Sequence, residues 1–145
     1  MQYLHQVGGI ILIWTNSLHK LKVKFPHTIN EIRGMGAING ISFNSPLEIF
    51  SKISGSIPIK FINDKKEFIE KLTVASIINH MYTEHNILTT VTLNPGDPLL
   101  SISPSLVASD EDISYFIESL EKTIAVGMNN LIFRFVKNNI YKLFN

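Results

Sequence analysis

Two histidines, His80 and His85, with Glu84 between them, are the residues best suited to metal or proton chemistry. Imidazoles bind metal ions and transfer protons near neutral pH. Metal-binding pairs on a helix favour a spacing of four residues. The spacing here is five, so we expect the two rings to lie well apart. With no further ligand cluster and no cysteine, the sequence predicts solvated histidines and no metal site.

Three glycines, Gly34, Gly36 and Gly40, stand close together. Their pattern is near the dinucleotide fingerprint GxGxxG, but Asn39 occupies the position of its third glycine. The fingerprint also needs a strand before it and a helix after it, whereas a strand-like segment follows here. We therefore predict a tight turn or bulge, and no cofactor-binding residue.

An acidic run, Asp110 to Asp112, follows Ser109. Paired carboxylates can act as a general acid and base. Negative charge after a capping serine is also typical of a helix start, and this is the simpler interpretation. No base is placed to activate any of the serines. The residues alone therefore predict no catalytic group.

The composition bounds the class of protein. The 145 residues suit one domain, and a hydrophobic content of 45% provides for a core. A net charge of +1 gives no electrostatic reason to expect nucleic acid as a partner. The absence of cysteine excludes disulfides and thiol chemistry and fits a cytoplasmic location. The apolar run Gly8–Trp14 is shorter than the roughly 20 residues of a membrane span.

Hydrophobic periodicity and turn residues predict the elements that must position any site. In order, we predict a helix at 3–24, a strand at 37–43, an irregular connection at 44–66, a helix at 66–86, strands at 87–93 and 99–103 joined by the turn Asn94-Pro95-Gly96-Asp97, and a helix from Ser109. This order predicts an α+β fold with helices packed on a small, mostly antiparallel sheet.

The C-terminal segment is predicted as a separate unit. We place one domain at 1–126 and an apolar, basic tail at 127–145, which we expect to be helical. Two interpretations remain open for the tail. It is either a basic amphipathic anchor on a membrane surface or a helix covering apolar surface of its own protein or a partner.

Four segments in order resemble the class III aminotransferases, which depend on pyridoxal phosphate. Glu31–Phe43 resembles "VRGxGLMxGIEF", and Val7-Gly8 with Leu18 resembles the helix before it. Ile102–Val107 is similar to "RxxPPLxI", and Ser109–Ile124 is similar to the closing helix of that family. Within the family, Glu84–Thr89 and Thr92–Asn94 resemble "EHGILT…TLN" of the putrescine (polyamine) branch.

The resemblance implies the C-terminal small lobe of a fold-type I enzyme. In that family a large domain binds pyridoxal phosphate through a lysine Schiff base, the enzyme is a homodimer, and its cofactor is the electron sink. The cofactor lysine precedes the matching region, and none of the eleven lysines here lies in a matching context. We therefore expect a chain that lacks the large PLP-binding domain, binds no cofactor alone and is inactive alone.

The resemblance also assigns roles to single residues. Ser101 stands where many relatives have an arginine that binds the substrate carboxylate, and we expect it nearest the substrate. Arg33, Gly34 and Gly36 are expected to shape the lobe and not to be catalytic. The alternative is a non-catalytic binding or regulatory domain, with the tail as its membrane contact.

Overall fold

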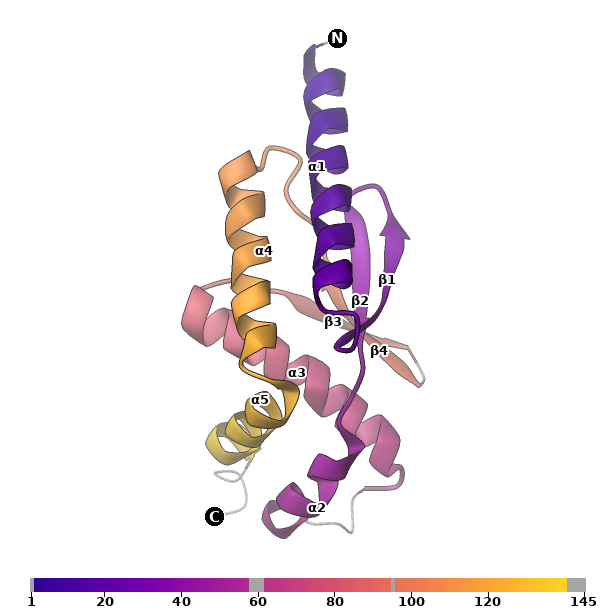
Figure 1. Cartoon of the computed structure of the whole chain (residues 1–145), viewed down its shortest axis with the longest axis vertical. Coiled ribbons are helices and arrows are strands. Elements are labelled where there is room, and N and C mark those ends of the chain that lie inside the picture. The colour runs from indigo at the N-terminus through magenta and orange to yellow at the C-terminus, as the bar shows by residue number, and fades with distance from the viewer. Residues whose placement is uncertain (1, 58–61, 95, 141–145) are drawn as a thin grey trace.

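A long helix, α1 (Gln2–Lys24), opens the structure (Figure 1), which is a computed structural model describing residues 2–57, 62–94 and 96–140. Its buried side is marked by Trp14, Leu18 and Leu21, each 2% exposed or less. These positions recur every three or four residues, as on one face of a helix. The helix predicted at 3–24 is confirmed.

The sheet has four strands in the order β1-β2-β4-β3: β1 (Ile29–Met35), β2 (Ile38–Phe43), β3 (Thr90–Asn94) and β4 (Asp97–Ile102). All neighbouring strands are antiparallel. Helices α1 and α3 contact the strands, and α1, α3 and α4 stand together in front of the sheet in Figure 1. The predicted α+β class and antiparallel sheet are confirmed.

Strand β1 was not predicted, since only a turn or bulge was expected before the strand at 37–43. It lies at the edge of the sheet, where Glu31, Arg33 and Gly34 are exposed. Its register with β2 shifts between Ile29 and Glu31. A bulge and polar residues on an edge strand break the alternation that identifies a strand in a sequence.

The predicted irregular connection at 44–66 was wrong in part, because it contains short helical turns. These are two 3-10 turns, η1 (Leu47–Ile49) and η2 (Ser54–Ser56), around α2 (Phe50–Ile53). Elements of three or four residues are too short to show the repeat of apolar residues by which a helix is recognised in a sequence. The part of the connection at 58–61 lies outside the described residues.

Helix α3 (Lys65–His85) confirms the helix predicted at 66–86. It ends at Asn86, whose φ of 56° is left-handed, and the N–H of Ile87 donates to the carbonyl of Met81 at 3.1 Å. This is the Schellman arrangement that commonly closes helices, usually with glycine at the left-handed position. Asparagine replaces that glycine here without loss of the motif.

The hairpin of β3 and β4 confirms the predicted turn. Asn94 stands directly opposite Asp97, and Gly96 has a φ of +77°. That value suits the third position of a type II turn, where glycine is preferred. Pro95, which belongs to the same prediction, lies outside the described residues.

Helix α4 (Asp110–Ala125) is followed by α5 (Met128–Phe135) and a π-helical turn (Val136–Ile140). The apolar residues of this last segment that are buried are Leu131, Ile132 and Val136. Helix α5 packs on α3, so the described part of the tail covers apolar surface of its own chain. Residues 141–145 of the tail lie outside the described part.

The buried apolar side chains form two clusters. The larger lies between α1, α3, α4 and one face of the sheet, around Trp14, Ile41 and Leu100. The smaller joins α2, the first half of α3 and α5, around Ile53 and Ile132. Within the described residues, no helix is both long enough and apolar enough to cross a membrane.

Candidate functional site

The glycines of the RGxG segment build the tip of the β1–β2 hairpin. Gly34 has a φ of +154°, and a Cβ there would overlap the carbonyl oxygen of Ile38 and lie 2.7 Å from Asn39 Cα. Gly36 has a φ of +61° and open space around it, as expected for the first central residue of a type II′ turn. The expected shaping role of both glycines therefore has a specific geometric basis.

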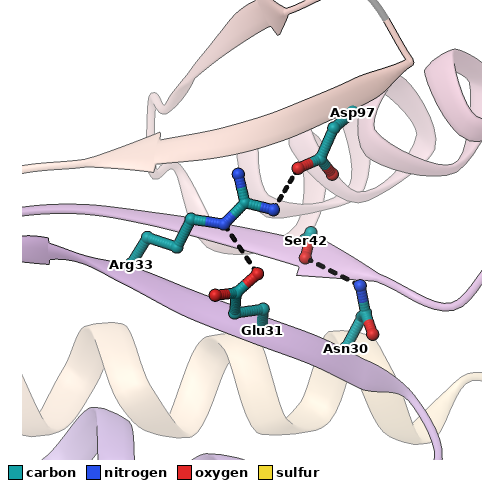
Figure 2. Close-up of polar contacts among 5 residues, drawn as sticks. All are labelled: Asn30, Glu31, Arg33, Ser42 and Asp97. Carbon is teal, nitrogen blue, oxygen red and sulfur yellow. Dashed lines mark hydrogen bonds and ion pairs between the residues drawn. The ribbon is translucent and has the colours of Figure 1, made fainter.

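Arg33 occupies a hydrogen-bonded position between two carboxylates (Figure 2). Its Nε donates to Glu31 Oε2 at 2.7 Å, and its Nη2 donates to Asp97 Oδ2. The hydrogen bonds that the Glu31 and Asp97 carboxylates accept raise the pKa of the Arg33 guanidinium. Both carboxylates already neutralise this cation, so Arg33 links strands and is not a free anion-binding group.

The register places the two main predicted positions on one face of the sheet. Gly40 of β2 stands opposite Arg33 on one side and opposite Ser101 on the other. Directly opposed residues share a face. The adjacent pair, Ile41 and Leu100, is fully buried on the other face. The sequence had not indicated that Arg33 and Ser101 lie in one row across three strands.

Ser101 lines a pocket of about 590 Å³ at the end of β4. The pocket is walled by Trp14 of α1, the segment before β3, the loop after β4 and the first turns of α4. The Ser101 hydroxyl is already hydrogen-bonded to Thr92 Oγ1 along the sheet. The structure therefore places Ser101 at a pocket wall, with its hydroxyl shared with a neighbouring strand.

The lining of this pocket is apolar and hydroxyl-rich. Apart from Ser101, its polar contributors include Thr89, Ser103, Ser105, Asp112 and Tyr115, and none of the described lining residues is Lys, Arg or His. A carboxylate bound here would meet no cation and would lie near the Asp112 carboxylate. The described residues that line this pocket therefore offer no basic group to bind a carboxylate.

Trp14 and Phe116 also line this pocket. Their rings pack at a tilt, with centroids 5.4 Å apart. Trp14 belongs to the buried stripe of α1, and Phe116 to the buried face of α4. The helical spacing of apolar residues predicts that both side chains are buried. It cannot show that a pocket lies beside the contact between α1 and α4.

The two histidines lie closer together than predicted. The ring centroids of His80 and His85 are 5.7 Å apart. Both residues contact α4: His80 Nδ1 is 3.2 Å from Thr123 Oγ1, and the Tyr115 hydroxyl donates to the backbone carbonyl of His85 at 2.8 Å. The prediction of well-separated rings was wrong, because it considered only the spacing of the two residues along the helix.

Burial lowers the pKa of His80, and the nearby His85 and Arg134 lower it further against the opposing effect of Glu84. His80 is therefore a neutral polar contact between α3 and α4 at neutral pH. Among the described residues, no group of three potential ligands could hold a metal ion.

The acidic run forms a helix start. Ser109 Oγ accepts from the N–H of Asp112 at 3.1 Å, and the Asp112 carboxylate accepts from the Ser109 N–H at 2.8 Å. This is a capping box. The two hydrogen bonds from Ser109 lower the pKa of Asp112. The capping interpretation is confirmed, and these carboxylates are not arranged as an acid–base pair.

Two lysines that line pockets, Lys66 and Lys22, can be compared with the needs of a site for pyridoxal phosphate. Such a site needs an amine beside groups that bind phosphate. Lys66 lines a pocket, but it shares that pocket with Glu70 and Asp97, whose carboxylates repel a phosphate. Lys22 lies beside α1 in a groove with His19, where the other polar groups are mainly side-chain amides. The linings of these two pockets therefore do not fit the cofactor.

No protein-family model and no curated protein matches the sequence. The fold, in contrast, is similar to parts of solved aminotransferases. A transaminase from the marine bacterium Virgibacillus is similar over 90% of this chain, with a TM-score of 0.62 and 10% identity. A Bacillus anthracis aminotransferase is similar over 79%, with a TM-score of 0.53 and 22% identity.

A third similar structure is an E243 mutant of M. tuberculosis Rv3290C, over 86% of this chain, with a TM-score of 0.59 and 14% identity. The chain spans 26%, 23% and 22% of the Virgibacillus, Bacillus anthracis and M. tuberculosis chains, respectively. Identities this low show the fold alone. The fold of this chain therefore corresponds to about a quarter of each of these solved chains.

Proposed function

We propose that this chain is the C-terminal small lobe of a class III aminotransferase and works only together with a domain that binds pyridoxal phosphate. The observation that carries the proposal is the similarity of nearly the whole fold to about a quarter of aminotransferase chains. The lobe's role is to complete the substrate pocket and to close over it. As in the family it resembles, we expect a cytoplasmic enzyme that is assembled as a homodimer.

The RGxG hairpin supports this proposal independently of the global similarity. The chain keeps the two glycines at positions where geometry requires or favours them, Gly34 by close backbone approach and Gly36 by its positive φ. Arg33 is held by carboxylates on two strands. The segment that carries the resemblance is therefore the segment with the strictest backbone requirements.

The substrate proposal follows from the pocket at Ser101. Since its described lining offers hydroxyls and apolar surface but no cation, we propose an amine donor that has no carboxylate at this end. A diamine such as putrescine fits that description. We propose Ser101 as the residue of this lobe nearest to the substrate.

We propose further that the chain does not transaminate alone. The reaction needs an amine that holds the aldehyde cofactor, and the described lysines in the pockets lie beside carboxylates or at a groove without a phosphate-binding cradle. The cofactor, when bound to the missing domain, supplies the electron sink. The present residues contribute shape and substrate contacts.

The gene provides the test. We expect the DNA upstream of Met1, or a neighbouring reading frame, to encode a domain with the cofactor lysine, and we expect that domain to co-purify with this chain when both are expressed together. The complex should convert putrescine and a 2-oxo acid, while neither part alone should do so. Unrelated flanking sequence would instead favour a non-catalytic binding or regulatory domain.

A further inference from the structure

The two edges of the sheet differ in how they are protected. Edge strand β1 carries Glu31, Arg33 and Gly34 and has a register shift near its start. Charges and bulges are the usual features that prevent an edge strand from pairing with another chain. Edge strand β3 has neither feature, and its register with β4 is regular.

Strand β3 is also exposed on both of its faces. Thr90, Val91, Thr92 and Leu93 are all exposed, with Val91 at 41% and Leu93 at 61%. Leu88, just before the strand, is 79% exposed. A flat strand rich in β-branched residues with exposed apolar side chains is a template for adding a further strand.

The backbone of β3 offers free hydrogen-bonding groups at this edge. Pro98 of β4 has no N–H and stands opposite Leu93, as expected at a non-hydrogen-bonded pair. Residues alternate along an antiparallel pair, so the N–H and C=O groups of Val91 and Leu93 point away from β4. Among the described strands, β3 pairs only with β4.

We propose that β3 pairs antiparallel with β3 of a second copy of this chain, joining two sheets into one about a two-fold axis at Thr92. In that register Val91 faces Leu93 of the second copy and Thr92 faces its own counterpart. Aliphatic and Thr–Thr cross-strand pairs are both stabilising. The strand is therefore complementary to itself.

Charge favours a second copy over a charged partner. The eleven residues from 86 to 96 contain no charged side chain, so two copies meet without repulsion, while a charged partner finds no countercharge. The contact is a single short strand per copy, well below the roughly 1,200 Å² of a stable interface. The association is therefore weak and depends on concentration.

Cysteine substitution tests the register, because the chain has no native cysteine. Thr92→Cys places two thiols opposite each other at the axis, and mild air oxidation should join two chains. Thr90→Cys, on the same strand and face, is the matched control. In the proposed register its two copies lie roughly 13 Å apart, beyond the Cα separation of a disulfide.

Analytical ultracentrifugation of the full chain over a concentration series tests the contact itself. We expect mass to rise from one chain toward two, and Leu93→Lys to raise the dissociation constant at least about tenfold. Met35→Lys, at a residue 89% exposed on the β1–β2 hairpin, should leave it unchanged.

A monomer at every concentration would overturn the proposal, as would cross-linking of Thr90→Cys at the rate of Thr92→Cys. Association that Leu93→Lys does not weaken would assign the contact to another surface and also overturn it. The proposal does not depend on the aminotransferase assignment, since none of these measurements involves a cofactor or a substrate.

Discussion

Arg33 of β1 and Asp97 of β4 form an ion pair across the intervening strand β2. Ser101, and not Asp97, is the residue of β4 in line with Arg33, so the arginine side chain reaches diagonally over β2 to Asp97. The contact ties the hairpin formed by β1 and β2 to the turn between β3 and β4 (Figure 2). The arginine of the RGxG segment therefore connects the two hairpins of the sheet.

A double-mutant cycle measures this link. Arg33→Gln and Asp97→Asn should each lower the free energy of unfolding slightly, and the double variant should lose less than the sum, because both single changes break the same pair. The coupling should shrink in high salt, since the pair is exposed. Urea unfolding followed by the fluorescence of Trp14, the one tryptophan, provides the measurement.

Arg33→Lys serves as the control for charge. Lysine keeps the cation but cannot form the planar fork that donates to Glu31 and Asp97 at once. We expect it to recover only part of the coupling. Equal stability of the Gln and Lys variants, with additive effects, would show that the ion pair contributes nothing.

Gly34→Ala should be the most damaging change in the hairpin. An added Cβ meets the backbone at Ile38 and Asn39, which cannot move as a flexible side chain can. We expect a loss of about 2 kcal/mol or more in the free energy of unfolding. Gly9→Ala is the matched control and should have the opposite sign, because Gly9 lies in α1 with open space around it and alanine favours a helix. A neutral Gly34→Ala variant would refute the required geometry.

We expect the free energy of unfolding to depend on pH through His80. Burial lowers its pKa in the fold below the ordinary value of 6.5, so the unfolded chain binds the proton more readily. The contribution of His80 to the free energy of unfolding is therefore fully present above pH 6.5, and it is lost as the pH falls through the lowered pKa of His80. We expect His80→Gln to flatten the decline in unfolding free energy from pH 7.5 to pH 5, while exposed His19→Gln leaves it unchanged. Parallel profiles for the wild type and His80→Gln would contradict this.

The start of α4 depends on the Ser109 cap. Ser109→Ala removes the side-chain acceptor for the Asp112 N–H and should cost about 1 kcal/mol of stability. Ser114→Ala, at an exposed position in the same helix, should cost nothing measurable. Similar losses for both variants would indicate that the cap is unimportant.

The sequence predicts helices long enough to repeat their apolar positions several times, and it predicts turns that contain characteristic turn residues. Trp14, Leu18 and Leu21 mark α1, and the residues Asn94 to Asp97 mark the second hairpin. Strand β1 was not predicted from the sequence, because Glu31 and Arg33 face solvent on an edge strand that contains a bulge. For an edge strand such as β1, the tertiary context and not the local sequence pattern decides the structure.

The candidate site was predictable only in part. The resemblance selects Ser101 and Arg33, but their position in one row depends on the pairing of β2 with both β1 and β4. The pairing of β2 with β4 brings Gly40 opposite Ser101, which is distant in the sequence, and no local pattern reports this. The contact of the His80 ring with Thr123 of α4 likewise joins residues far apart in the sequence.

Titration of the purified chain with pyridoxal phosphate, followed by absorbance, tests the central claim most directly. A lobe that depends on another domain for its cofactor should show only the aldimine signal of a control protein with the same number of exposed lysines. A saturable signal at one cofactor per chain, removed by changing a single lysine, would show that this chain holds the cofactor itself and would contradict the account.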